Sequence, residues 1–141
     1  MIFIYLLPLI VISIIDIRTR RIPDYLSGLV GLIGISHVYQ LASDSSIAWR
    51  QGMTAAAGIF FLMLIVAVIS SGGIGGGDIK LATALSLPVG AMGWEQLIFA
   101  WIVISLCMLG IILILLVLRK PLKTAVPFGP CLALGYLAGM V

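Results

Sequence analysis

The chain has 141 residues, of which 62% are hydrophobic and only 9% are charged, and its mean hydropathy is +1.29. A water-soluble domain of this length could not bury so large an apolar fraction, so the composition indicates a polytopic membrane protein, folded as one domain over residues 1–141. The net charge of +3 is too small to indicate a nucleic-acid partner.

Six apolar segments follow one another along the chain, and a helix needs roughly 20 residues to cross a hydrocarbon core of about 30 Å. The first segment has no basic stretch before it and no small-residue cleavage site after it, so we expect an uncleaved span rather than a signal peptide. The fourth is short and is interrupted near Pro88 and Gly90. The predicted transmembrane helices cover residues 2–17, 25–42, 52–71, 78–92, 95–118 and 125–141.

The basic residues predict the orientation of this bundle, because cytoplasmic loops carry an excess of Lys and Arg. Of the eight basic residues, only Arg50 falls on the outer side. We therefore expect an all-α membrane protein of about six transmembrane helices with both termini on the non-cytoplasmic side. Trp49 and Trp94 then fall at outer span ends, where such side chains commonly anchor. The residues expected on the inner side are Arg18, Arg20, Arg21, Lys80, Arg119, Lys120 and Lys123.

Two acidic residues lie at the expected cytoplasmic edge of the membrane. Asp16 closes the first span and Asp78 opens the fourth. Ionisable groups at membrane depth are costly and usually functional, and two at the same depth could meet across a bundle. The alternative is that each carboxylate extends to water beside its basic neighbours. Asp44, in an outer loop, and Glu95, in the first turn of the fifth span, have ordinary solvated or helix-capping positions.

A carboxyl pair without a histidine, a cysteine cluster or a serine triad is typical of aspartic-protease chemistry. Two adjacent carboxyls cannot both ionise cheaply, so one keeps a proton while the other deprotonates a water. Asp78 begins a helix, whose dipole favours a negative charge, whereas Asp16 ends one. The helix ends thus favour Asp78 as the resting carboxylate, although Arg18 and Arg20 act in the opposite sense at Asp16.

Three motifs, in this order, resemble those of the type IV prepilin peptidase family of membrane aspartic proteases: DIRTRRIPD at 16–24, GGIGGGDIKL at 72–81 and VPFGPCLALG at 126–135. The resemblance implies that Asp16 and Asp78 are the catalytic pair and that no cofactor is needed. It implies cleavage of prepilins or pseudopilins after the leader glycine, at the cytoplasmic face of the bacterial inner membrane. The expected partners are therefore this protein substrate and the lipid bilayer.

The larger bacterial members of that family also carry a domain with paired C-x-x-C zinc sites and methylate the new N-terminus of the substrate. The two cysteines here, Cys107 and Cys131, lie alone in apolar segments and are expected to be packing residues. We therefore expect no metal site, and peptidase activity without methyltransferase activity.

The same motifs supply the residues expected to line the site. A run of glycines is expected to let an extended substrate backbone lie beside Asp78. Asp24 is expected to cap the second helix or to contact the substrate, and Lys80 to anchor the inner face or to act on the acid pair. His37, near the outer end of the second span, is expected to be a packing residue. The other expected lining residues are Gly75, Gly76, Gly77, Pro127, Phe128, Gly129 and Pro130.

Three alternatives fit part of the sequence. A signal-peptide-peptidase or presenilin-type protease shares the G-x-G-D motif, but its Y-D and P-A-L motifs are missing here. A small ion-coupled transporter would use Asp16 and Asp78 as proton sites, but it favours acids near the bilayer centre and repeated halves. A non-catalytic assembly protein would tolerate Asp16→Asn and Asp78→Asn. The sequence does not specify the particular prepilin, the machine it serves or the oligomeric state.

Overall fold

The computed structural model describes residues 2–19, 21–42, 46–70, 74–119 and 128–141. Every regular element within these ranges is an α helix, which confirms the predicted all-helical class. The helices are α1 (Ile2–Thr19), α2 (Asp24–Leu41), α3 (Ser46–Ile69), α4 (Gly76–Met92), α5 (Trp94–Val117) and α6 (Gly129–Gly139).

Most helix boundaries lie within a few residues of the predicted spans. The largest difference is at α3, which begins at Ser46 rather than at residue 52. The sequence there is polar enough to resemble a loop, but Arg50 and Gln51 are good helix formers and continue the apolar helix outward. Residues 125–127, where the last span was predicted to begin, lie outside the described residues, as does Asp44.

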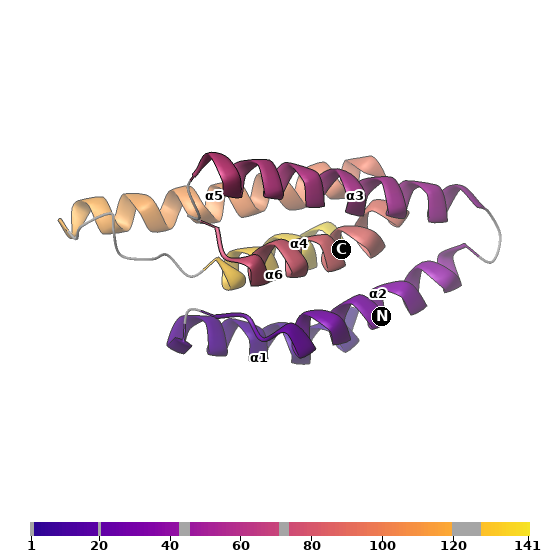
Figure 1. Ribbon diagram of the computed structural model, residues 1–141, viewed down its shortest axis with the longest axis horizontal. Coiled ribbons are helices and arrows are strands. Elements are labelled where there is room, and N and C mark those ends of the chain that lie inside the picture. The colour runs from indigo at the N-terminus through magenta and orange to yellow at the C-terminus, as the bar shows by residue number, and fades with distance from the viewer. Residues whose placement is uncertain (1, 20, 43–45, 71–73, 120–127) are drawn as a thin grey trace.

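The helices lie in three layers along one long axis, with α4 and α6 between the α3–α5 layer and the α1–α2 layer (Figure 1). Successive helices run in opposite directions. As a result, one end of the bundle collects the last turn of α1 and the first turns of α2, α4 and α6. The first turn of α1 and the last turn of α6 lie toward the other end.

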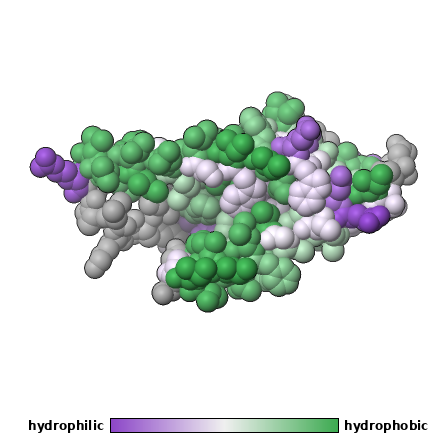
Figure 2. Space-filling model, turned by 90° about the horizontal axis from the view of Figure 1, so that it is seen from above, coloured by the Kyte–Doolittle hydropathy of each residue, from purple (hydrophilic) through white to green (hydrophobic). Residues whose placement is uncertain are grey.

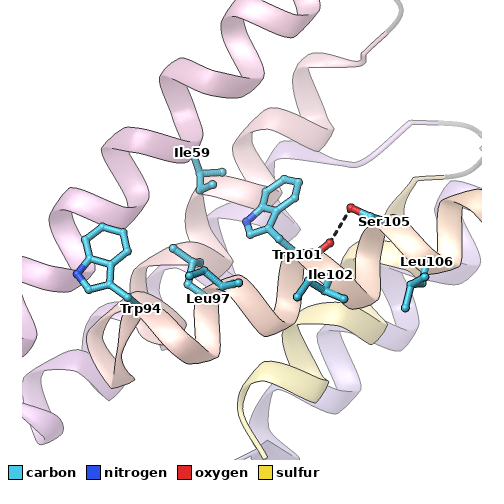
Figure 3. Close-up of a pocket in the computed structure, with 8 residues that line it drawn as sticks. Ile59, Trp94, Leu97, Trp101, Ile102, Ser105 and Leu106 are labelled. Atoms are coloured by element: carbon cyan, nitrogen blue, oxygen red, sulfur yellow. Dashed lines mark hydrogen bonds between the residues drawn. The ribbon is translucent and has the colours of Figure 1, made fainter.

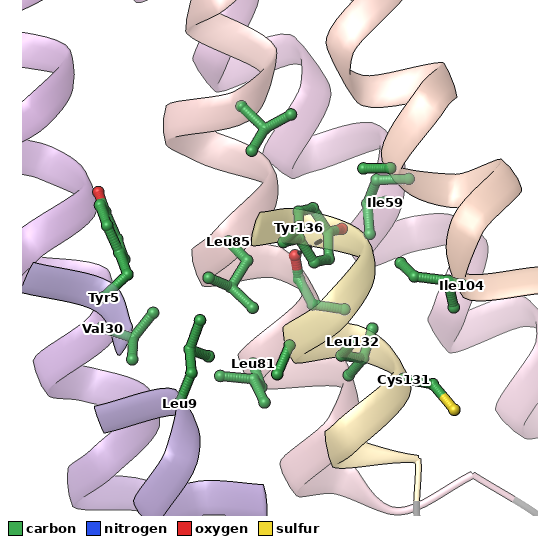
Figure 4. Close-up of a cluster of buried hydrophobic side chains, with 14 of the residues drawn as sticks. Tyr5, Leu9, Val30, Ile59, Leu81, Leu85, Ile104, Cys131, Leu132 and Tyr136 are labelled. Atoms are coloured by element: carbon green, nitrogen blue, oxygen red, sulfur yellow. Dashed lines mark hydrogen bonds between the residues drawn. The ribbon is translucent and has the colours of Figure 1, made fainter. Parts of the chain in front are cut away.

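The two shortest helices form the centre of the core. Leu81 and Leu85 of α4, and Leu132 and Tyr136 of α6, are completely buried (Figure 4). They are surrounded by side chains of the outer layers, including Leu9 of α1. Backbone outside a helix is tolerated at membrane depth where protein, rather than lipid, surrounds it. The short length of α4 and α6 is therefore compatible with their central position.

Small residues bring the central helices close to their neighbours. A Cβ atom on Gly52 of α3 would lie 2.8 Å from the carbonyl oxygen of Leu87 in α4. A Cβ atom on Gly139 of α6 would lie 2.8 Å from the carbonyl oxygen of Gln96 in α5. Close backbone approach through small residues is the usual way in which helices associate within membranes.

The outer surface is strongly apolar. Large hydrophobic side chains stand out on several helices, for example Leu7, Val68 and Val117, which are 73%, 74% and 78% exposed. Hydrophobic residues cover much of the face in Figure 2, and hydrophilic ones lie mostly toward the two ends of the long axis. Two of the described helices, α3 and α5, are long and apolar enough to cross a membrane, and only 11% of the apolar window of α5 is buried. An exposed apolar surface of this extent fits contact with lipid.

Two buried side-chain pairs connect helices away from the acids. The sulfur atoms of Cys107 in α5 and Cys131 in α6 lie 2.9 Å apart, and both residues are free thiols. They pack in the core as predicted, but their contact could not be predicted, because they lie 24 positions apart on different helices. His37 lies 3.3 Å from the hydroxyl oxygen of Tyr5, measured at Nδ1, and is buried, as expected of a packing residue.

Candidate active site

The fold places Asp16 and Asp78 at the same end of the bundle. Asp16 lies in the last turn of α1 and is only 5% exposed, and Asp78 is the third residue of α4 and is half-buried. The two carboxyl groups are close enough for the charge of Asp16 to act on Asp78. The fold therefore brings two acids that are far apart in the sequence near each other.

A backbone group of α6 holds Asp16. The N–H of Gly129 donates a hydrogen bond to Oδ2 of Asp16 over 2.8 Å. The N–H groups of a helix's first turn have no acceptor within the helix, and the helix dipole favours a negative charge there. Asp16 thus ends α1 but faces the beginning of α6. The N-terminus of α6 therefore opposes the unfavourable C-terminal dipole of α1 at Asp16, so the helix ends alone do not single out Asp78 as the resting carboxylate.

The carboxyl group of Asp78 lies at the beginning of its own helix. Gly75 occupies the N-cap position of α4, and Oδ2 of Asp78 turns back toward it, since a Cβ atom on Gly75 would lie 3.2 Å from that oxygen. An acidic residue three positions after the N-cap commonly reaches back in this way. Oδ1 of Asp78 is buried and has no hydrogen-bond partner among the described residues. Oδ1 is therefore the oxygen of Asp78 that no described group binds.

The three glycines before Asp78 have different surroundings. A Cβ atom on Gly77 would lie 2.9 Å from Cβ and 3.0 Å from the carbonyl oxygen of Ile22, in the segment between α1 and α2. The space beside Gly77 is therefore already filled, which corrects the expectation that it leaves room for a substrate. Gly75 and Gly76 are exposed, and a Cβ atom on Gly76 would meet nothing within 4 Å.

Asp24 and Lys80 form an ion pair, with Oδ2 and Nζ separated by 2.8 Å. Pro23 occupies the N-cap position of α2 without a side-chain capping bond, so Asp24 is the first helical residue and not the predicted cap. The side chains are 71% and 56% exposed, and exposed pairs of this kind contribute about 0–1 kcal/mol. This pair was not predicted from the sequence, although opposite charges at the first turns of two helices at one end of the bundle are a signal for it.

The last motif lies beside the acids only in part. Gly129 is buried against Asp16, whereas Phe128 and Pro130 are half-buried at the beginning of α6. Phe128 packs against the hydrophobic core. Pro127 lies outside the described residues.

A groove of about 480 Å³ lies between α3 and α5 (Figure 3). It is lined by Ile59 of α3 and by a row of α5 side chains that includes Trp94 and Trp101. None of its lining residues is ionisable, and neither acid lies in it. Within the described parts of the chain, no three His, Cys, Asp or Glu residues are grouped so that they could hold a metal ion. The acid pair is therefore the candidate site.

The model of the type IV leader peptidase family matches residues 3–117, which include both acids. A prepilin leader peptidase/N-methyltransferase of Bacillus subtilis (strain 168) is 30% identical over 130 residues, which are 90% of this chain and 49% of that protein. A protein of the same name from Escherichia coli (strain K12) is 28% identical over 141 residues, 98% of this chain and 61% of that protein.

The chain thus spans about half to three-fifths of the length of these relatives. No solved structure matches it. Because the family model covers most of the chain, the protein belongs to the type IV leader peptidase family.

Proposed function

We propose that the protein is a membrane-embedded aspartic endopeptidase that removes the leader peptides of type IV prepilins or pseudopilins, cutting after the leader glycine. Its family makes it a peptidase, and the names of its relatives suggest this substrate class. The observation that carries the aspartic mechanism is that Asp16 and Asp78 lie at the same end of the bundle, Asp16 held by the N–H of Gly129 and Asp78 in the first turn of its own helix.

In the proposed mechanism, the carboxyl pair shares one proton, because two neighbouring carboxylates repel each other. The ionised carboxyl removes a proton from a water molecule, whose oxygen attacks the scissile carbonyl carbon. The protonated carboxyl donates a hydrogen bond, and then its proton, to the carbonyl oxygen. As the tetrahedral intermediate collapses, the C–N bond breaks and the amide nitrogen takes up a proton from the pair. One hydroxyl of the intermediate returns its proton to the pair as the carboxyl product and the amine are released.

The contacts divide the four carboxyl oxygens into two groups. Oδ2 of Asp16 accepts a hydrogen bond from the N–H of Gly129, and Oδ2 of Asp78 turns back toward Gly75, 3.2 Å from where a Cβ atom of that residue would lie. Oδ1 of Asp78 is buried without a partner. This division supports a mechanism in which one oxygen of each acid fixes the carboxyl group and the other contacts the water or the scissile carbonyl.

The exposed glycines support a path for the substrate backbone. Gly75 and Gly76 bear no side chains at the edge of the bundle, next to Asp78. An extended leader segment can lie against such a stretch and bring its scissile bond to the acids. Gly77 instead belongs to the packing that fixes α4 against Ile22.

We further propose that all six helices cross the bacterial inner membrane, with both termini outside the cytoplasm and the acids at the cytoplasmic face. Basic residues support this orientation, since Arg18, Lys80 and Arg119 belong to the end of the bundle that carries the acids. Trp94, at the beginning of α5, lies at the opposite end.

We expect this chain to cleave its substrate without methylating it. Support comes from its two cysteines, which pack against each other in the core rather than forming C-x-x-C pairs. Incubating the purified chain with a prepilin and an isotopically labelled methyl donor tests this expectation. Label in the cleaved product would contradict it.

The test of the proposed function uses purified protein in liposomes with a synthetic prepilin, and mass spectrometry of the products. Wild-type protein should release the leader after its glycine, and a substrate in which that glycine is replaced by a bulky residue should remain intact. A pH-sensitive dye inside the same liposomes tests the transporter alternative. Proton flux without cleavage would contradict the proposed function.

A further inference from the structure

The hydrogen bond from Gly129 to Asp16 connects two residues that are 113 positions apart in the sequence. Both residues are buried. A backbone N–H that donates to a carboxyl oxygen forms one of the stronger hydrogen bonds of proteins when the acceptor is ionised, and here water does not compete for it. The bond therefore fixes the direction in which the carboxyl group of Asp16 points.

Gly129 is available as a donor because it is the first residue of α6. Its N–H has no acceptor within the helix. Pro130 follows it and has no N–H at all, so the next residue cannot substitute for it. The dipole of α6 adds to the attraction for a carboxylate at this position.

The missing side chain of Gly129 is as important as its N–H. A Cβ atom there would lie 2.9 Å from Oδ2, 3.1 Å from Cβ and 3.2 Å from Cγ of Asp16. An alanine must therefore displace either the carboxyl group or the first turn of α6. The helix has little freedom to move, because a Cβ atom on Gly135 would lie only 2.6 Å from the carbonyl oxygen of Ala100 in α5.

We propose that Gly129 is a positioning residue of the peptidase, whose N–H and missing side chain together aim the carboxyl group of Asp16 at Asp78. Oδ2 of Asp16 serves as the anchor, and Oδ1 is left for the chemistry. The proposal rests on the proposed function, since it takes Asp16 as one member of the catalytic pair. The first residue of α6 would thus affect the cleavage rate by orienting Asp16, without contacting the substrate itself.

The first experiment compares Gly129→Ala with Gly110→Ala, a control in α5 where a Cβ atom would meet nothing within 4 Å. Cleavage of a synthetic prepilin gives kcat and KM, and thermal unfolding shows whether each variant is folded. Misplacement of a catalytic group by about 1 Å costs on the order of 100-fold in rate. We expect kcat of Gly129→Ala to fall by about that factor while its KM stays within about twofold of wild type, and Gly110→Ala to match wild type.

A folded Gly129→Ala variant with wild-type kcat, or one in which only KM changes, overturns the positioning role. If wild-type protein cleaves the substrate while Gly129→Ala behaves normally, only the positioning role fails. If wild-type protein does not cleave at all, the proposed function fails, and the positioning role fails with it.

The second experiment decides the question even if Gly129→Ala does not fold. Selective labelling of glycine with ¹⁵N allows the amide resonance of Gly129 to be compared between wild type and Asp16→Asn. Removing the acceptor's charge should shift the Gly129 amide and speed its hydrogen exchange, with Gly110 unchanged as the internal control. Equal shifts and equal exchange of Gly129 in the two proteins would overturn the proposal.

Discussion

Replacing Gly77 with Ala tests whether the contact between α4 and the segment after α1 sets the geometry of the acids. The new Cβ atom would lie 2.9 Å from Cβ and 3.0 Å from the carbonyl oxygen of Ile22. Ordinary contacts of such an atom begin at 3.4 Å, so the two segments must separate by about 0.5 Å. Ile22 is buried, and its carbonyl belongs to the backbone, so it cannot rotate out of the way.

The expected loss of stability is moderate and the expected loss of activity is larger. Overpacking costs about 1–3 kcal/mol, and Ala in place of Gly in a helix returns up to about 1 kcal/mol. The free energy of unfolding should therefore fall by about 0–3 kcal/mol, and the protein should remain folded. Asp78 follows Gly77 directly, so a shift of about 0.5 Å should lower the cleavage rate on the order of 10-fold.

Gly76→Ala is the matched control for stability, because Gly76 shares the first turn of α4 but faces open space. Thermal unfolding in detergent should show Gly77→Ala to be less stable than Gly76→Ala. Initial rates of prepilin cleavage, corrected for the folded fraction, should show the loss of activity of Gly77→Ala against wild type. Equal unfolding temperatures of the two variants, together with a wild-type cleavage rate for Gly77→Ala, would refute the reasoning.

Two further predictions concern interactions away from the acid pair. A double-mutant cycle of Asp24→Asn and Lys80→Gln should give a coupling of about 0.2–1 kcal/mol in the free energy of unfolding, because the pair is exposed. Added salt should weaken this coupling. A coupling above this range that does not change with salt would contradict the prediction. Tyr136→Phe removes a buried hydroxyl that lies 2.6 Å from Oγ of Ser86 and 3.2 Å from the carbonyl oxygen of Ala82. It should lower the free energy of unfolding by about 1–3 kcal/mol without changing cleavage per folded molecule, and an unchanged unfolding temperature would argue against this.

The helices could be predicted well from the sequence because an apolar segment marks each one, and glycines, prolines or charged residues separate it from the next. Even the short α4 was predicted, because an apolar segment marks it despite Pro88 and Gly90. The beginning of α3 was misplaced because apolar segments show where the hydrocarbon core lies, whereas a helix can extend beyond it. Trp49 and Arg50 belong to that extension.

The site could be predicted less completely. Loop charges place Asp16 and Asp78 at one end of the bundle, but they do not show what each side chain touches. The contact of Gly129 with Asp16 depends on how α6 packs between α1 and α5. For the same reason, the sequence could not show that Gly77 is enclosed by packing whereas its neighbours are exposed.

The central claim is that Asp16 and Asp78 act together to cleave prepilins, and single-turnover cleavage by Asp16→Asn and Asp78→Asn tests it most directly. Asparagine keeps the shape of each side chain but can neither accept nor supply the proton. Each variant should fold and bind the substrate, but its single-turnover cleavage rate should fall on the order of 1,000-fold or more. Cleavage by either folded variant within tenfold of the wild-type rate would contradict it.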